Sequence, residues 1–228
     1  MSEEYSIFPM SESALTVDFG NAVSPELNKR AVAAAEHFQK VPFPGFIEAV
    51  PAYSSTTIFY DLSIVRQKME GYTTAFFAVE SIVREALKKI EIVEDAYSRL
   101  VEIPVEFDLA GEMDLAHIAD HAQLGISEVI EIFLSTIYRV YMLGFLPGFT
   151  YMGEVDERIA APRKDTPRKT VPAGSVGIAG TQTGIYSLAS PGGWQIIGRT
   201  KMKLFSPDAA DICPLRPGDS VRFRTANV

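Results

Sequence analysis

The chain is poor in cysteine, in positive charge and in long apolar runs, and each shortage excludes a class of protein. Cys213 is the only cysteine among 228 residues, so no internal disulfide can form and a reducing compartment is expected. Asp and Glu outnumber Lys and Arg by 29 to 21, which disfavours a nucleic-acid binder because phosphate recognition needs a basic face. No apolar run spans a bilayer and the first residues do not resemble a secretory signal. We therefore expect a cytoplasmic protein without a nucleic-acid or membrane partner.

The usual catalytic signatures are absent as well. The sequence contains neither a G-x-x-x-x-G-K-[ST] loop for nucleotide phosphates nor a G-x-S-x-G nucleophile turn. His117 and His121 are four residues apart in a predicted helix, near Asp114 and Asp120, but no third ligand is evident, so a solvated helix face is favoured over a metal site. Cys213 is predicted to be a packed thiol rather than a nucleophile, because no nearby sequence feature lowers its pKa.

Periodicity in the first hundred residues predicts alternating strands and helices. Apolar and polar residues alternate in 14–19, which is typical of a half-buried strand. Ser24 followed by Pro25 predicts a helix start, and an apolar stripe at helical spacing follows it. Further strands are predicted at 46–50, 56–60 and 101–107, and a second helix at 79–90. The resulting order β-α-β-β-α-β is that of a ferredoxin-like fold.

The composition changes in the rest of the chain. Two short helices are predicted between residues 109 and 136, separated at Gly125, with Ser127 capping the second. The sequence then becomes dense in glycine and proline, with strand-like segments such as SVGIAG, GWQIIGRT and SVRFRT, which predict a closed barrel or a sandwich. The boundary is placed between about residues 90 and 105. We expect an α/β domain at 1–95 and a β domain at 96–228.

Two segments of the second domain are candidate binding surfaces. The segment APRKDTPRKTVPAGS, 161–175, concentrates cations in an acidic protein, and its prolines stiffen the backbone, so the cations are ready for an anion at a low entropic cost. The segment LASPGGWQIIGRT, 188–200, carries the only tryptophan beside two glycines. The residues leave a second interpretation open for each segment. Residues 161–175 are then a solvated basic loop, and residues 188–200 are then the glycine-rich turns of a barrel rim.

Three long motifs carry a resemblance to a known family. The segments YMLGFLPGFTYMG, APRKDTPRKTVPAGSVGIAGTQTGIY and SPGGWQIIGRT strongly resemble the allophanate hydrolase subunit 1-like family, and LTVDFG, PELN and PAYSSTTIFYD resemble its first domain. The resemblance covers nearly the whole chain, and the motifs occur in order. It implies an α+β protein with a small ferredoxin-like α/β N-terminal domain and a cyclophilin-like β-barrel C-terminal domain.

The resemblance also implies an activity, because members of the family include the B subunit of bacterial 5-oxoprolinase. It implies a hydrolase component that takes part in the ATP-dependent opening of 5-oxo-L-proline to L-glutamate. The resemblance further implies that such a component is active only with its partners, the C subunit, which is allophanate hydrolase subunit 2-like, and the A subunit. ATP, with Mg, is implied for the assembled complex, and no tightly bound group for this chain.

The same family also includes the sporulation histidine-kinase inhibitor KipI. The alternative is therefore an inhibitor that binds the dimerisation and phosphotransfer helices of such a kinase, and one protein could do both.

The implied reaction needs cations, because arginine can hold a transferring phosphate and a substrate carboxylate through paired N–H donors. Candidates for anion or substrate binding are Arg163, Arg168, Gln182, Thr183, Ser190 and Arg199. Candidates for a pocket wall or partner surface are Phe145, Phe149, Tyr186, Gly192, Gly193 and Trp194. No catalytic base can be assigned. Trp194 is expected at the barrel rim, open to a partner, and Arg199 on the other face of the same strand, in an anion site or, as the less favoured alternative, in a structural ion pair.

Overall fold

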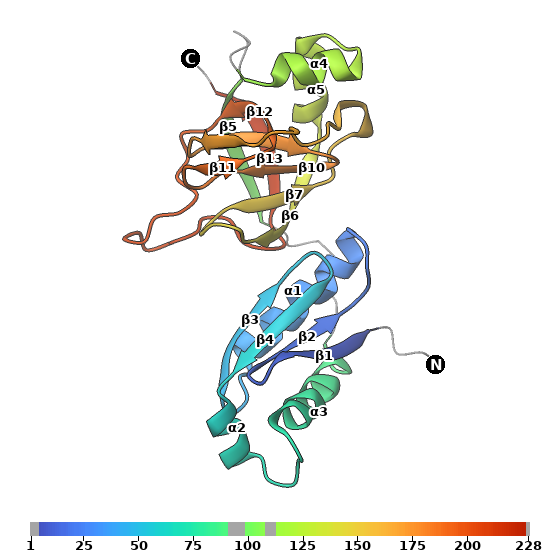
Figure 1. Cartoon of the computed structure of the whole chain (residues 1–228), viewed down its shortest axis with the longest axis vertical. Helices are drawn as coiled ribbons and strands as arrows, with labels where there is room; N and C mark the ends of the chain where they lie inside the picture. The colour runs from blue at the N-terminus through green and yellow to red at the C-terminus, as the bar shows by residue number, and fades with distance from the viewer. Residues whose placement is uncertain (1–4, 91–98, 108–112, 227–228) are drawn as a thin grey trace. The chain divides into compact units, whose positions relative to one another are not determined.

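The chain forms two compact units, residues 1–97 and 98–228, in a computed structural model that describes residues 5–90, 99–107 and 113–226 (Figure 1). None of the described helices is long and apolar enough to cross a membrane. The predicted domain boundary at 95/96 falls in a segment, 91–98, that lies outside the described residues. We propose that the two units are separate folding domains, and that the boundary lies in this segment.

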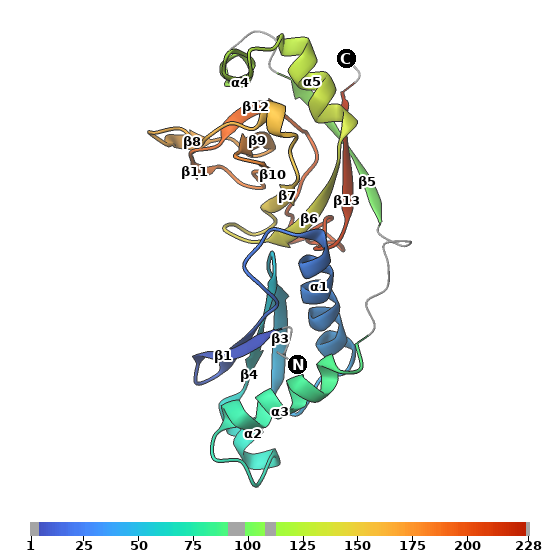
Figure 2. The ribbon, with the colours of Figure 1, turned by 90° about the vertical axis from the view of Figure 1, so that its right-hand side faces the viewer.

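The first unit is an antiparallel sheet with helices on one side. The sheet has the order β1-β2-β4-β3, and Figure 2 shows α1 and α3 on the same side of it. Helix α1 begins at the predicted Ser24-Pro25 pair, and its stripe of alanines with Phe38 is buried against the sheet. The elements are β1 (Ser6–Ser11), β2 (Ala14–Asp18), α1 (Pro25–Lys40), β3 (Phe46–Pro51), β4 (Ser55–Tyr60), α2 (Leu62–Lys68) and α3 (Ala75–Leu87).

The second unit is a closed seven-stranded barrel, in the order β10-β7-β6-β13-β5-β12-β9, with a two-stranded sheet, β11-β8, beside it. Its interior is filled by one large apolar cluster that also covers the inner sides of α4 and α5. The elements are β5 (Leu100–Phe107), α4 (Leu115–Ala122), α5 (Ile126–Ser135), β6 (Ile137–Leu143), β7 (Thr150–Gly153), η1 (Glu157–Ile159), β8 (Arg168–Val171), β9 (Ser175–Ala179), β10 (Gln182–Ile185), β11 (Ser190–Gly192), β12 (Gln195–Arg199) and β13 (Ser220–Thr225).

The α+β class, with an N-terminal α/β unit and a C-terminal barrel, is confirmed, but one strand was assigned to the wrong unit. The strand predicted at 101–107 is β5, which belongs to the barrel and pairs in parallel with β13. Its apolar alternation identified a strand but carried no information on its partner, which lies more than a hundred residues away. The fourth strand of the N-terminal sheet is instead β1, which the sequence analysis did not predict; it is an edge strand and contains Pro9, a residue that sheets tolerate at their edges.

The helix start at residue 126 also differs from the prediction. Gly125 occupies the N-cap of α5, and Ser127 lies inside the first turn of the helix instead of capping it. Glycine tolerates this position nearly as well as serine does, so the choice between two nearby cap residues cannot be made from the sequence.

Candidate functional site

The site is built on a small aromatic cluster of the barrel unit, separate from the main core. Trp194, Phe149, Tyr186 and Tyr151 pack against one another with Val171, Ala179 and Ile196. The ring of Phe149 lies edge-on to those of Trp194 and Tyr186, with centroid distances of 5.6 and 5.0 Å. Such edge-to-face contacts fix the orientation of each ring and stabilise it beyond the area buried. The cluster is therefore a rigid floor beneath the loops that cross it.

Glycines make room for these rings, and the two that approach Trp194 lie outside its own segment, on the strands β9 and β10. A Cβ atom at Gly184 would lie 3.0 Å from the indole of Trp194, and one at Gly177 would lie 3.1 Å from its Cβ. At Gly192, a Cβ would overlap the hydroxyl of Tyr186. Glycine is therefore needed at these three positions because neighbouring side chains approach the backbone closely, and not because the backbone has to be flexible.

Replacing Gly192 by alanine is expected to destabilise the barrel by about 1–3 kcal/mol, because the buried ring of Tyr186 has to shift to make room for the added Cβ. Urea unfolding of the full chain, followed by circular dichroism, measures this change. Gly125→Ala is the matched control, since nothing lies within 4 Å of the added Cβ, and it should cost less than about 1 kcal/mol. Equal losses for the two variants would contradict the packing argument.

The basic segment is attached along one side of the aromatic cluster by several hydrogen bonds. The backbone N–H of Lys164 donates to the carbonyl of Gly193 at 2.7 Å, and Gln195 Nε2 donates to the carbonyl of Pro162 at 2.9 Å. Arg168 Nη1 donates to the carbonyl of Trp194 at 3.4 Å. These contacts hold residues 162–168 against the backbone that precedes and begins β12.

A buried carboxylate, Asp114, completes this attachment. It is only 4% exposed at the start of α4, and its oxygens accept hydrogen bonds from Lys164 Nζ at 2.9 Å and from the backbone N–H of Ile196 at 2.8 Å. Arg168 Nη2 lies 2.6 Å from Asp114 Oδ2. Burial raises the pKa of Asp114, but the hydrogen bonds from Ile196, Lys164 and Arg168 outweigh it, and the pKa lies below its usual range. The carboxylate is therefore ionised at neutral pH and neutralised by two cations.

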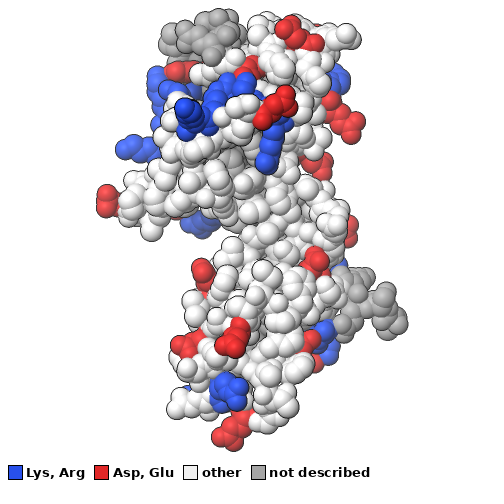
Figure 3. Space-filling model, viewed as in Figure 1, with Lys and Arg blue, Asp and Glu red and all other residues white. Residues whose placement is uncertain are grey.

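Arg163 is an exposed cation beside this buried group. Its guanidinium carbon lies 5.9 Å from the ring centroid of Trp194, a cation–π distance. Burial raises the pKa of Tyr151, and the positive charge of Arg163 opposes that shift. Among the residues that the structure describes, no carboxylate pairs with Arg163. Figure 3 shows Lys and Arg side chains gathered on the visible face of the barrel unit. Arg163 is available to bind an anion.

Two polar candidates from the sequence analysis do not join the group around Arg163. Arg199 is exposed at the far end of β12, roughly 13 Å along the strand from Gln195, so it does not join Arg163 and Arg168. Thr183 is fully buried, and its hydroxyl donates to the carbonyl of Gly177 at 2.9 Å, so it is not open to a ligand.

Two other polar candidates lie nearer to the basic segment. Gln182 is the first residue of β10. Two residues before it, Gly180 forms a β-bridge with Ala161, the first residue of the basic segment. Ser190 is buried in β11, which pairs with β8. Gln182 is half-buried and stays a candidate for a neutral hydrogen bond to a ligand, whereas the hydroxyl of Ser190 donates to the carbonyl of Pro191 at 3.2 Å and is closed to one.

The expected open position of Trp194 has to be corrected. Its side chain is buried, with 5% of the residue exposed, because it packs closely against Gly177 and Gly184 and lies among aromatic rings. Phe149 and Tyr186 are buried with it. Of the four aromatic candidates only Phe145 is open to solvent, at 64% exposure, and its ring contacts Phe149 edge-on at 5.7 Å. The aromatic surface that a partner could meet is therefore Phe145, supported from beneath by the other three rings.

Phe145 also has an unusual backbone. Its φ of +63° lies in the left-handed region, which is costly for a residue with a large side chain. The strained turn holds the ring outward above Phe149. A strained and exposed aromatic residue is more typical of a binding surface than of a packing element.

The sequence analysis missed the central role of Asp114, which it considered only as a metal ligand. The sequence signal was weak, being an acidic residue in a region predicted to form short helices. Its partners, Lys164 and Ile196, lie 50 and 82 residues further along the chain, so no local pattern could have connected them.

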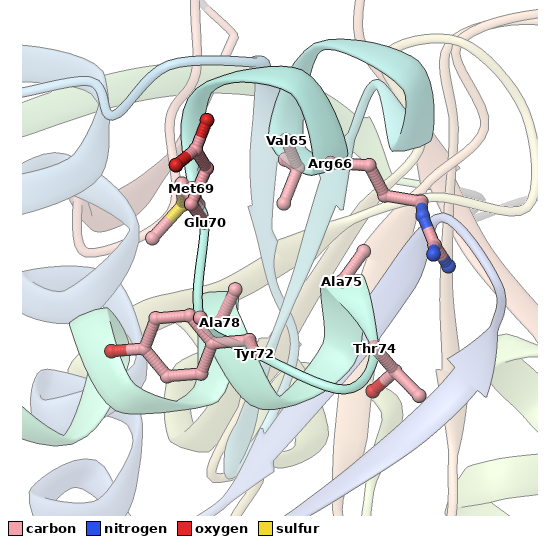
Figure 4. Close-up of a pocket in the computed structure, with 9 residues that line it drawn as sticks. Val65, Arg66, Met69, Glu70, Tyr72, Thr74, Ala75 and Ala78 are labelled. Atoms are coloured by element: carbon pink, nitrogen blue, oxygen red, sulfur yellow. The ribbon is translucent and has the colours of Figure 1, made fainter.

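A cavity of about 190 Å³ lies elsewhere, in the first unit between α2 and the start of α3. It is lined partly by apolar side chains such as Val65 and Met69, with Arg66 and Glu70 among its polar residues. Figure 4 shows the charged ends of Arg66 and Glu70 pointing away from each other. None of the residues proposed from the sequence lines this cavity.

Comparison with known proteins identifies the class to which this fold and site belong. The family model of the carboxyltransferase domain, subdomain C and D, matches residues 5–215, and the chain belongs to this family. The chain is 43% identical over 224 residues to the B subunit of 5-oxoprolinase from Bacillus subtilis (strain 168), covering 98% of this chain and 93% of that protein. It is 41% identical over 214 residues to the B subunit of 5-oxoprolinase from Escherichia coli O157:H7, covering 94% and 93%.

A solved structure confirms the arrangement of elements. The crystal structure of TTHA0988 matches with a TM-score of 0.80 and 38% sequence identity. The match covers 95% of this chain but only 40% of that chain. TTHA0988 therefore joins a unit like this one to a longer stretch of the same polypeptide.

Proposed function

We propose that this chain is the B subunit of a 5-oxoprolinase and acts as one part of an enzyme complex. The observation that carries this proposal is the 43% identity, over almost the full length of both chains, to a protein of that name. Matching lengths at this identity favour a shared role for the whole chain rather than a shared fold alone.

Other chains complete the enzyme in this proposal. The name of the relatives designates one of several subunits, and TTHA0988 continues well beyond the part that matches this chain. We infer that a separate polypeptide, the C subunit, supplies the part that is covalently attached in such longer proteins, and that the A subunit is also needed. Phe145 is the exposed aromatic residue that we assign to the contact with one of these partners.

The substrate, 5-oxo-L-proline, contains an amide that resonance makes a poor electrophile. We propose that the assembled enzyme transfers the terminal phosphoryl group of ATP to the lactam oxygen, releasing ADP. Water then adds to the activated carbon, and the ring C–N bond breaks to leave an acyl phosphate. A second water molecule releases phosphate and gives L-glutamate. ATP is assigned to the complex, because this sequence has no P-loop of its own.

The chain contributes a fixed cation to this chemistry. The substrate carboxylate and the transferring phosphoryl group are both anions, and guanidinium binds either one through paired N–H donors. Arg163 is exposed, held over a rigid ring and without a carboxylate partner among the described residues, so it meets the requirement. Gln182 is the neutral donor that we place nearest to it.

The purified chain alone is expected to show no ATP hydrolysis that depends on 5-oxo-L-proline, and the complete set of subunits is expected to show it. The reason is that the described residues supply an anion-binding cation but no nucleotide loop and no assigned base. Release of phosphate in the presence and absence of 5-oxo-L-proline measures the activity. L-Proline, which lacks the lactam carbonyl, is the matched control substrate. Turnover by the isolated chain, or its absence from a correctly assembled complex, would contradict the proposal.

Inhibition of a sporulation histidine kinase stays a prediction. No contact among the described residues favours it over the enzymatic role.

A further inference from the structure

A single buried carboxylate connects three distant segments of the barrel unit. Asp114 stands at the start of α4, accepts a hydrogen bond from the backbone of β12 through Ile196, and contacts Lys164 and Arg168 of the basic segment. Its own backbone N–H donates to the carbonyl of Ile196 at 2.8 Å. These contacts leave Asp114 only 4% exposed, so the group is built into the fold.

The contacts of the basic segment lie on both sides of Arg163. On one side, the carbonyl of Pro162 accepts from Gln195, and on the other side Lys164 is bound through both its backbone and its ammonium group. A residue between two fixed neighbours has little backbone freedom, which is why the guanidinium of Arg163 can be kept above Trp194.

The charges of Lys164 and Arg168 make the carboxylate necessary. Both cations lie within 3 Å of Asp114 and both are more than half buried, so without the negative charge they would repel each other in a poorly solvated place. The segment would then lose the two ion pairs that connect it to the start of α4, and only its hydrogen bonds to Gly193, Trp194 and Gln195 would remain. With the carboxylate present, Lys164 and Arg168 each have Asp114 as an ion-pair partner. Arg163 has no carboxylate partner among the described residues, so its charge can interact with a ligand.

We propose that Asp114 is a positioning residue: it holds residues 162–168 on β12 so that Arg163 presents its guanidinium to an anion above Trp194. This inference rests on the proposed function only in naming the anion as the substrate carboxylate or the transferring phosphoryl group. Asp114 itself contacts neither, and it acts through Arg163.

Trp194 provides a readout that is independent of enzyme activity, because it is the only tryptophan in the chain. Iodide and acrylamide both quench its fluorescence, but only iodide is attracted by a cation. A charge about 6 Å from the ring raises the local iodide concentration about 2–3-fold before screening by salt. The ratio of the iodide to the acrylamide quenching constant, measured on the full chain at low ionic strength, therefore reports whether Arg163 lies over the ring.

The test is a double-mutant cycle of Asp114→Asn and Arg163→Ala. Each single substitution is expected to lower the quenching ratio about twofold, and the double variant is expected to be no lower than Arg163→Ala alone. In the assembled enzyme, Asp114→Asn should lower kcat/KM about 100-fold in the wild-type background but less than about twofold in the Arg163→Ala background.

The matched control is Asp219→Asn. Asp219 is a buried carboxylate of the same unit, paired with Arg99 and accepting the backbone N–H of Arg216. Its loss is expected to lower the melting temperature without changing the quenching ratio or the kinetic constants. If Asp114→Asn fails to fold, Lys164→Met replaces it, because this variant removes the ion pair between residue 164 and Asp114 and leaves the buried carboxylate paired with Arg168.

An unchanged quenching ratio in folded Asp114→Asn would overturn the inference, and so would effects of the two substitutions that simply add. The result also separates this inference from the proposed function. A cycle that behaves as expected in fluorescence, in a complex without 5-oxoprolinase activity, would support the positioning role of Asp114 and contradict the enzymatic assignment.

Discussion

Arg163→Ala is expected to lower kcat/KM of the assembled 5-oxoprolinase about 100-fold, with no change in the melting temperature of the chain. Arg163 is exposed and pairs with no described carboxylate, so its removal costs the fold little. It is also the cation that we assign to the anion of the reaction. Steady-state kinetics with 5-oxo-L-proline and ATP as varied substrates, beside a thermal melting curve, measure both parts of this expectation.

The matched control for this experiment is Arg158→Ala. Arg158 is also an exposed arginine of the barrel unit, but its guanidinium is bound to Asp156 at 2.7 Å at the surface. This substitution should leave kcat/KM unchanged. Arg163→Lys should recover only part of the activity, because an ammonium group lacks the paired donors of guanidinium. Normal turnover by Arg163→Ala would transfer the anion-binding role to Arg199 or to a partner chain.

Trp194→Ala is expected to destabilise the barrel by about 3–5 kcal/mol, the usual cost of removing a large buried aromatic side chain. Trp194 is 5% exposed and contacts Phe149 and Tyr151, so the substitution leaves a cavity among rings that glycines already place close together. Urea unfolding followed by far-ultraviolet circular dichroism measures the loss, with the barrel transition identified from methyl NMR signals.

Ile137→Ala is the control for this variant, because Ile137 is a half-exposed apolar residue of the same unit and should cost less than about 1 kcal/mol. The comparison also decides what kind of residue Trp194 is. If Trp194→Ala unfolds like the wild-type chain but assembles poorly with its partners, then Trp194 is a partner anchor and its burial in the aromatic cluster is not what stabilises the barrel.

Residue patterns predicted those features of the chain that depend on near neighbours in sequence. Helix α1 starts at Ser24-Pro25 as expected, because a cap and a proline act on the turn that follows them. The strands around SVGIAG and SVRFRT form where alternation and glycine turns predicted them. The basic segment and the tryptophan segment were both singled out, and they do meet in the structure.

These sequence patterns could not predict which segments pair when the segments are far apart in the chain. The strand β5 was placed in the wrong sheet, since alternation gives the faces of a strand and not its neighbour. Trp194 was expected to be open, because the sequence shows adjacent glycines but not that Gly177 and Gly184 make room for the ring. Asp114 was overlooked because all of its side-chain partners lie at least 50 residues away.

The sequence by itself determined the class of this protein: an acidic α+β chain with a C-terminal β domain, a single tryptophan among glycines and a concentration of cations between 161 and 175. Only the tertiary structure decided which of those cations are paired with a buried carboxylate. Lys164 and Arg168 are neutralised by a carboxylate brought from the start of α4, whereas Arg163 lies beside them and keeps its charge. The physical reason is that ion pairing in a folded chain depends on distance in space, and the closure of the barrel sets that distance.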